Sequence, residues 1–288
     1  MTKILDTNFK ENKKFNVIFN SPHSGSLYTK EFIKSSKLNI HDLRTSEDAF
    51  VGELFNSART SGCLFIEAKF PRSFVDLNRS HLELDPKLIS GDFHYEKTVR
   101  NMAGLGVIPR MSGNGKEIYN SYIFIDDVIK RLKVFYFPYH RFLEDLIFLS
   151  KKRLGYAIIF DCHSMPSNLS VDFKNSKKNN ASDIILGDVN GTSCSSFLTK
   201  KVKTIFERHD FLVTTNYPFS GGFITKNYGK PENSVHVIQI EVNKKLYMDE
   251  EKIKKNKNFE NFQRKIQSII EELSFINLFE GNDNIAAE

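Results

Sequence analysis

The chain has 288 residues, of which 40% are hydrophobic, 26% charged and 12% aromatic, and this is enough apolar material for a full-sized core. The composition therefore excludes a disordered or fibrous protein, and we expect a single globular domain over residues 1–288. The net charge of +6 does not by itself exclude binding to nucleic acid. The basic residues, however, lack the interleaved aromatic residues of a protein that binds single strands, so we expect no nucleic-acid partner.

Short runs of β-branched and aromatic residues, typical of strands, alternate along the chain with longer helical patterns. In chain order we predict a strand at 15–19, a helix at 46–60, a strand at 63–66, irregular structure at 78–122, a helix at 125–153, strands at 157–160 and 184–186, a helix at 194–209, a strand at 235–242 and a helix at 251–276. Several strands are continuously apolar, which suits strands covered on both faces. The sequence therefore predicts an α/β fold with a mixed, largely parallel central sheet flanked by helices on both faces.

Local signals mark some of these helices. Thr45 is the expected N-cap of the helix at 46–60, with Asp48 three residues later completing a capping box. Pro138 should break the helix at 125–153. The four glycines between Gly104 and Gly115 predict irregular structure, of the kind that covers a site.

The cysteines and the apolar runs bear on the compartment. Cys63, Cys162 and Cys194 are unevenly spaced and make neither a disulfide framework nor a C-x-x-C zinc site, so we expect a reducing, cytoplasmic setting. No apolar run approaches the ~18 residues of a membrane span, so we expect no membrane partner. Cys162 adjoins His163, but neighbours in an extended segment point to opposite sides, which argues against a nucleophilic Cys/His pair.

Two histidines follow two predicted strands. Residues 15–19 lead into Asn20-Ser21-Pro22-His23, and residues 157–160 lead into Asp161-Cys162-His163. Because ligands collect beyond the carboxyl ends of strands in open α/β sheets, His23 and His163 are expected to converge. Two imidazoles and one carboxylate form a recurring catalytic zinc site, so we predict two metal ligands here. The alternative is a pair of buried histidines with structural hydrogen bonds.

The carboxylate of such a site has to come from elsewhere in the chain, because no acid closely follows His23. Glu47 and Asp48 are the nearest candidates, at the start of the predicted helix. A carboxylate also stabilises that end of a helix, so Asp48 could equally be only a capping residue. The residues alone leave both acids and both roles open.

Arginines and an amide gather in the segment Phe70-Pro71-Arg72-Ser73-Phe74-Val75-Asp76-Leu77-Asn78-Arg79. A guanidinium fork suits a carboxylate bidentately, so Arg72, Asn78 and Arg79 are candidates for binding an anionic substrate. Arg110 is a third, more isolated arginine candidate. Surface salt bridging is the alternative for all of these residues.

The predicted strand at 235–242 places Gln239 and Glu241 on one face. A carboxylate in such apolar surroundings is costly unless it is paired or functional. Glu241 could take a proton from water and pass it to a leaving amine, as amide hydrolysis requires. The alternative is an ion pair with a nearby Lys or Arg.

Taken together, these motifs resemble the N-formylglutamate amidohydrolase family, from Ser21-Pro22-His23-Ser24-Gly25 to Gln239-Ile240-Glu241-Val242-Asn243. The intervening matches, in the family's order, are 70–79, 136–140, 161–166, 186–188 and 246–248. The family is similar to the zinc carboxypeptidase-like fold, which implies a mixed α/β sheet and one zinc ion per chain, or another divalent metal.

The resemblance also implies a role for each candidate residue. It implies zinc ligation by His23, Asp48 and His163, polarisation of the scissile carbonyl by Arg72, substrate-carboxylate binding by Asn78 and Arg79, and general-base action by Glu241. The carboxypeptidase spacing His-x-x-Glu is absent at His23, and Asp48 rather than Glu47 matches the family's acid. Lys244 stands where the family usually has Arg, a change that bears on substrate specificity.

The resulting hypothesis is a zinc-dependent amidohydrolase that converts N-formyl-L-glutamate to L-glutamate and formate, a reaction of histidine degradation. Its partner is then a small N-acyl amino acid, and the sequence leaves open whether the protein is a monomer or a homo-oligomer. The alternatives are a carboxypeptidase-like hydrolase of another N-acyl compound or short peptide, and a non-catalytic protein that binds an anionic metabolite.

Overall fold

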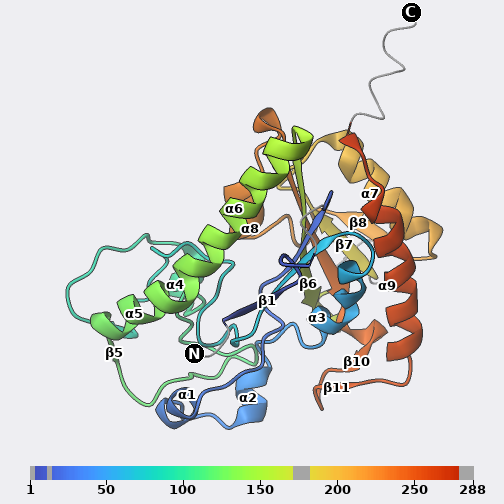
Figure 1. Ribbon diagram of the computed structural model, residues 1–288. Helices are drawn as coiled ribbons and strands as arrows, with labels where there is room; N and C mark the ends of the chain where they lie inside the picture. Colours follow the sequence, from blue (N-terminus) through green and yellow to red (C-terminus); the bar gives the residue numbers. More distant parts are fainter. Residues whose placement is uncertain (1–3, 12–14, 171–181, 279–288) are drawn as a thin grey trace, which may run out of the picture. The chain divides into compact units, whose positions relative to one another are not determined.

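The computed structural model of the protein describes residues 4–11, 15–170 and 182–278. Within these residues, seven strands form one sheet in the order β1-β3-β2-β6-β9-β7-β8. Strands β1, β6, β7 and β8 are labelled in Figure 1. The strands are β1 Leu5–Thr7, β2 Ile18–Ser21, β3 Leu64–Ala68, β6 Ala157–Met165, β7 Ile184–Gly187, β8 Val213–Thr215 and β9 Val235–Asn243. Strand β6 is parallel to β2 and β9, and β7 is parallel to β8 but antiparallel to β9. The predicted mixed, largely parallel sheet is therefore confirmed.

The remaining elements are helices and two small sheets. The helices are α1 Lys30–Ser35, α2 Ile40–Arg44, α3 Val51–Leu54, α4 Val99–Met102, α5 Ile125–Arg131, α6 Phe137–Leu154, α7 Ser196–Arg208, α8 Phe223–Tyr228 and α9 Phe259–Ser274. The short strands β4 Ile89–Ser90 and β5 Ile123–Phe124 pair in parallel, and β10 Met248–Asp249 pairs antiparallel with β11 Lys254–Lys255. Among the described residues, no helix is both long and apolar enough to cross a bilayer.

The chain forms two compact units, and each is assembled from separate segments. The first unit contains the residues up to Asp6, Ser21–Gly52 and Ile66–Leu146. The second contains Thr7–Asn20, Glu53–Phe65 and the chain from Ile147 onward. The path of the chain therefore alternates between the units.

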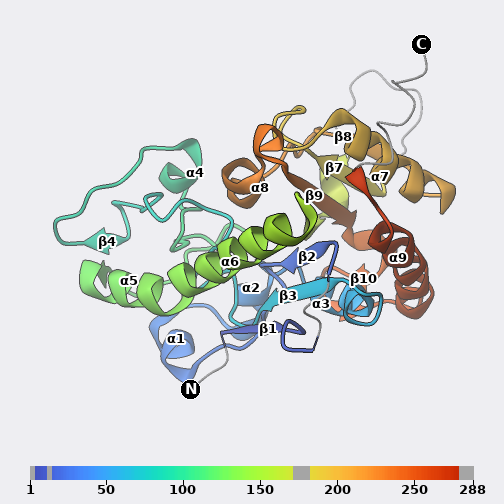
Figure 2. The same cartoon turned by 45° about the horizontal axis from the view of Figure 1, so that its top comes forward.

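The second unit is built on β6 and β9, whose residues are buried along their whole length. The helices α7 and α9 lie side by side (Figure 2) and bury apolar residues at helical spacing, such as Val202 in α7 and Ile266 in α9. Each such buried side chain contributes about 1.5–3 kcal/mol of hydrophobic stabilisation. Helix α7 also packs on β7 and β8 of the same sheet.

The first unit is held together by an aromatic cluster. The Phe74 ring lies 5.1 Å from Phe32 and 5.2 Å from Phe135, and the Arg131 guanidinium lies 4.3 Å above Phe74. These contacts fix the segment 70–79 against α1 and the helical turn after α5. Residues 78–122 are mostly irregular, as predicted, with only α4 and β4 inside this stretch.

Two predicted helix starts are wrong. The helix expected from residue 46 begins only at Val51, and the Thr45 hydroxyl donates to Asp42 O at the end of α2 instead of capping a new helix. Phe50 has a φ of +66°, which a right-handed helix cannot accommodate. The helix expected from residue 251 begins at Phe259, because β10 and β11 form a hairpin before it.

Pro138 does not end its helix. Proline has no N–H to donate to Val134 O, the α-helical acceptor four residues earlier. The chain instead forms a π-helical turn over Leu132–Tyr136, where Phe137 N–H donates to Leu132 O, and then continues as α6 (Figure 1). The predicted break does not occur, because one π-helical turn within the continuous helix accommodates the missing N–H of Pro138.

Candidate metal and substrate site

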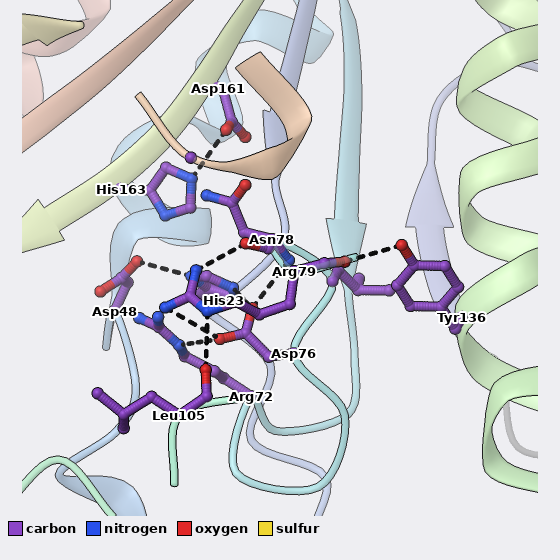
Figure 3. Close-up of polar contacts among 12 residues, drawn as sticks. His23, Asp48, Arg72, Asp76, Asn78, Arg79, Leu105, Tyr136, Asp161 and His163 are labelled. Carbon is purple, nitrogen blue, oxygen red and sulfur yellow. Dashed lines mark hydrogen bonds and ion pairs between the residues drawn. The ribbon is translucent and has the colours of Figure 1, made fainter. Parts of the chain in front are cut away.

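His23 follows the end of β2 and is 1% exposed. Its Nε2 lies 2.8 Å from Asp76 Oδ1, and its Nδ1 lies 3.5 Å from Asp48 Oδ2 (Figure 3). The backbone N–H of Asp48 donates to His23 O at 3.1 Å. The imidazole therefore has a carboxylate beside each ring nitrogen.

Gly25 allows the loop after His23 to approach β3 closely. A Cβ at residue 25 would lie 2.3 Å from Phe70 O and 2.6 Å from Ala68 O, closer than backbone atoms permit. Glycine is therefore required in the Ser-Pro-His-Ser-Gly motif for steric reasons.

The two neighbouring acids, Glu47 and Asp48, have different surroundings. Glu47 Oε1 accepts from the Tyr28 hydroxyl at 2.7 Å, and Arg44 Nε donates to both Glu47 oxygens at 3.2 Å. Burial, and then the Glu47 charge, raises the pKa of Tyr28, so this phenol stays protonated and donates. Asp48 instead faces His23, and because α3 begins only at Val51, Asp48 is not at the third position of a helix as the capping-box pattern predicted.

Asp76 is the centre of the polar network in the first unit. Besides His23, its Oδ1 accepts from Asn78 N at 2.8 Å, and its Oδ2 pairs with Arg72 Nε at 2.9 Å. Burial opposes ionisation, but the charges of Arg72, Arg79 and His23 outweigh it and hold the pKa of Asp76 well below its usual range. Asp76 is therefore a carboxylate at neutral pH and can orient His23.

Arg79 is held mainly by backbone carbonyls. Its Nε donates to Leu105 O at 2.9 Å and its Nη1 to Asn78 O at 2.7 Å, while Nη2 lies 3.8 Å from Asp76 Oδ2 (Figure 3). Burial lowers the pKa of Arg79 to about 10, so its guanidinium stays charged at neutral pH. The arrangement leaves N–H groups on Nη2 to meet an anion.

Arg110 lies outside this network. Its Nε pairs with Asp85 Oδ2 at 2.7 Å, and its Nη1 lies 3.4 Å from Glu117 Oε1. With Lys37 and Lys87 it lines a separate polar hollow of about 250 Å³. Arg110 is thus brought together with other basic residues but not with Asp76.

His163 lies inside β6 rather than in a loop after it, because the strand continues to Met165. Its Nε2 lies 3.0 Å from Asp161 Oδ2 (Figure 3), and Asp161 Oδ1 accepts from Asn20 Nδ2 at 2.8 Å. The side chains of Asp161 and His163 are two residues apart and so share one face of the strand. Cys162 lies between them in the strand and therefore points to the other face.

Glu241 is the register partner of His163 in the neighbouring parallel strand β9, and Gln239 is the partner of Asp161. Register partners point to the same face of a sheet, so four polar side chains share one face of a wholly buried strand pair. Gln239 Nε2 donates to Glu241 Oε1 at 2.7 Å, and Gln239 Oε1 accepts from Gly222 N at 2.7 Å. Gln239 therefore orients the Glu241 carboxylate.

The donor set is suitable for a metal ion. Among the described residues, His23, Asp48 and His163 are buried side chains of the kinds that hold a metal ion. His23 Nε2 is hydrogen-bonded to the buried Asp76, and His163 Nε2 lies 3.0 Å from the buried Asp161 Oδ2, a charge contact rather than a hydrogen bond. Histidines that bind metals usually have such a carboxylate on the other nitrogen, where it fixes the tautomer and ring orientation. The residues present therefore fit a metal centre of two imidazoles and a carboxylate.

Sequence reasoning missed three of these contributors. Asp76 lies inside the arginine segment but was not singled out, and neither was Asp161 or Tyr28. Asp161 could have been found, because it lies two residues before His163 in a predicted strand. Asp76 and Tyr28 lie outside helices and strands, so no periodicity in the sequence indicates their partners.

Comparison with known proteins points to one family. A family model described as N-formylglutamate amidohydrolase matches residues 15–248. N-formylglutamate deformylase of Pseudomonas aeruginosa is 26% identical over 238 residues, covering 82% of this chain and 83% of the relative. The Pseudomonas putida enzyme of the same name is 25% identical over 237 residues, covering 81% and 82%.

Solved structures agree with this match. The crystal structure of N-formylglutamate amidohydrolase from Ralstonia eutropha superposes with a TM-score of 0.86 at 26% identity, over 94% of this chain and 96% of that chain. A gene product from Agrobacterium tumefaciens gives a TM-score of 0.67 at 14% identity, over 94% and 93%, and shows a shared fold.

Proposed function

The chain belongs to the N-formylglutamate amidohydrolase family, and we propose that it hydrolyses N-formyl-L-glutamate to L-glutamate and formate. The observation that carries the proposal is the register pair His163 and Glu241, which sets a candidate metal ligand beside a candidate base on one face of β6 and β9. The names of the relatives from both Pseudomonas species and Ralstonia eutropha support the substrate.

We propose that one zinc ion, or another divalent metal, is held by His23, Asp48 and His163. Support comes from the donor types and from the carboxylates Asp76 and Asp161 behind the two imidazoles. When bound, such an ion acts as a Lewis acid toward the formyl oxygen and lowers the pKa of water.

Glu241 is the proposed proton carrier. Its Oε1 accepts from Gln239, which orients the carboxylate to take a proton from water as the water oxygen bonds to the formyl carbon. The same proton then passes to the amide nitrogen as the carbon–nitrogen bond breaks, giving formate and the free amino group of glutamate. Burial of Glu241 excludes bulk water from this transfer.

Arginines and an amide are the proposed substrate contacts. Arg72 stabilises negative charge on the formyl oxygen, while Asn78 and Arg79 hold a substrate carboxylate. Arg110 is proposed as an outlying anion contact, supported by its position beside Lys37 and Lys87 in the polar hollow.

Formate release from N-formyl-L-glutamate by the purified protein tests the reaction. We expect release that zinc supports and a chelator stops. Glu241→Gln should keep the metal and lose turnover by at least a hundredfold, on the order of the contribution of general acid–base catalysis. Glu83→Gln, also a buried glutamate but hydrogen-bonded to Ser80 N and Thr98, should remain active.

If protein that contains zinc releases no formate, N-formyl-L-glutamate is refuted as the substrate, but hydrolase activity on another compound is not. Lys244, in the place of the family's usual Arg, favours a different N-acyl amino acid in that case, and a panel of N-formyl and N-acetyl amino acids would identify it. Substantial activity of Glu241→Gln would refute its role as base.

Two broader features belong to the same proposal. We propose that residues 1–288 form a single hydrolase domain, since each compact unit is assembled from separate chain segments; a single cooperative unfolding transition tests this. We also propose a cytoplasmic role in histidine degradation. The buried thiols of Cys63, Cys162 and Cys194, which form no disulfide, support a reducing compartment.

A further inference from the structure

Three consecutive backbone carbonyls, those of Leu77, Asn78 and Arg79, accept hydrogen bonds from side chains. His140 Nε2 lies 3.1 Å from Leu77 O. Arg79 Nη1 donates to Asn78 O at 2.7 Å, and the Tyr136 hydroxyl donates to Arg79 O at 2.8 Å (Figure 3). This segment is neither helix nor strand, so no ladder of backbone hydrogen bonds holds it. Its conformation depends on these side chains.

Two of the three donors come from the continuous helix that follows β5. Tyr136 is the last residue of the π-helical turn Leu132–Tyr136, and His140 is one turn further on, in α6. A carbonyl can only accept, so His140 Nε2 carries the proton. The rings of Tyr136 and His140 lie 4.2 Å apart, so each limits the movement of the other.

The π turn determines where Tyr136 points. A π turn contains one more residue than an α turn, so it rotates the side chains that precede Pro138 relative to those of α6. Tyr136 and His140 both lie in or beside this turn, and both point to the segment 77–79. Single π turns in α-helices frequently occur at functional sites, and here the turn faces the proposed substrate arginine.

The Arg79 side chain depends on the same backbone. Its guanidinium is tied to Asn78 O and Leu105 O, so a shift of residues 77–79 moves both the Cα of Arg79 and one of its acceptors. We propose that Tyr136 and His140 are positioning residues that hold Asn78 and Arg79 in the geometry that binds the substrate carboxylate. This inference rests on the proposed function, and neither residue needs to contact the substrate.

Tyr136→Phe removes the hydroxyl and leaves a buried carbonyl without that donor. The matched control is Tyr119→Phe: Tyr119 is also buried, and its hydroxyl accepts from Arg131 Nη1 at 2.7 Å, away from residues 77–79. The measurements are Kd for L-glutamate by calorimetry, and KM and kcat for N-formyl-L-glutamate where the wild-type protein turns it over.

We expect Tyr136→Phe to raise Kd and KM about five- to tenfold, as expected for a lost hydrogen bond to a buried group, with kcat within about twofold of wild type. Tyr119→Phe should leave both constants within about twofold. L-glutamine and L-isoglutamine each lack one of the two carboxylates of L-glutamate. For the one that lacks the carboxylate bound by Arg79, Tyr136→Phe and wild type should have equal Kd. A purely structural defect would weaken the binding of all three ligands equally.

His140 gives a second, independent test. His140→Gln keeps an N–H donor near the position of Nε2. It should retain more affinity for L-glutamate than His140→Leu, which keeps the approximate size of the side chain but has no donor. Equal affinity of these two variants would overturn the role of His140.

The outcomes separate this inference from the proposed function. Formate release by wild type, together with equal constants for Tyr136→Phe and Tyr119→Phe, would overturn the positioning role and leave the function intact. Weaker glutamate binding by Tyr136→Phe without any formate release would support the positioning role and refute the function. A wild-type protein that neither binds L-glutamate nor releases formate would overturn both.

Discussion

Replacing Asp76 with Asn should weaken both the fold and the metal centre. The substitution keeps the shape of the side chain but removes its charge and one acceptor oxygen. Asp76 is 2% exposed and is in contact with His23 Nε2 and Arg72 Nε. The variant would therefore leave Arg72 without its buried counter-charge and His23 without a carboxylate to orient it.

The magnitude follows from the burial of the two partners. Removing one member of a buried ion pair costs about 3–5 kcal/mol. The Arg72 side chain is 27% exposed, so water compensates part of the loss, and we expect about 2–3 kcal/mol. Loss of the group behind a metal-binding histidine typically weakens metal affinity about 10- to 100-fold.

The dependence of this loss on pH can be derived from the pKa of Asp76. Because the folded state lowers that pKa, the stabilisation is complete above the unfolded value of about 3.9 and disappears as the pH falls through the lower folded value. Urea unfolding of metal-free protein should therefore show the full difference between wild type and Asp76→Asn at pH 7 and pH 5. The difference should shrink only below about pH 4.

Asp85→Asn is the matched control. Asp85 is also fully buried and pairs with an arginine, Arg110, at 2.7 Å, but it lies outside the His23 network. We expect a comparable loss of stability and unchanged zinc affinity. Equal zinc affinity of Asp76→Asn and Asp85→Asn would refute the argument that Asp76 orients His23.

The remaining predictions concern the metal ligands, the loop after His23 and metal removal. Asp48→Asn should reduce the zinc content measured by atomic absorption, while Glu47→Gln, which disturbs the contacts with Tyr28 and Arg44, should retain it. Loss of zinc from Glu47→Gln but not from Asp48→Asn would make Glu47 the metal ligand. Gly25→Ala should lower the yield of folded protein, or cost at least ~2 kcal/mol in urea unfolding, because its Cβ would overlap the backbone at Phe70; wild-type stability would contradict the observed close approach. Chelation should lower the thermal midpoint, since an ion at 100 times its Kd stabilises the fold by about 2.7 kcal/mol; an unchanged midpoint would argue against a bound metal.

The sheet was predictable because its strands are short apolar runs. The predictions at 157–160 and 235–242 both fell within observed strands, since β-branched residues buried on both faces have few alternatives. The polar end of β6 was harder to predict. Asp161 and His163 interrupt the apolar pattern, and pairing with β9 extends the strand to Met165, beyond the predicted end at residue 160.

The candidate site was predictable in its residue types and less so in its local geometry. His23 and His163 stood out because each follows an apolar run. Asp48 was placed at a helix start by a capping-box pattern, whereas the left-handed conformation of Phe50 delays the helix to Val51. Positive φ at a bulky residue is enforced by tertiary packing, so a local propensity cannot reveal it.

The pairing of β6 with β9 also has a consequence for biosynthesis. A ribosome releases β6 well before β9, so the newly made chain exposes one edge of a nine-residue strand that is wholly buried in the folded protein until the later segment arrives. Parallel pairing over such a long separation is intrinsically slow. During translation this open edge can pair with another copy of the chain, and slower synthesis at low temperature should give a larger soluble yield.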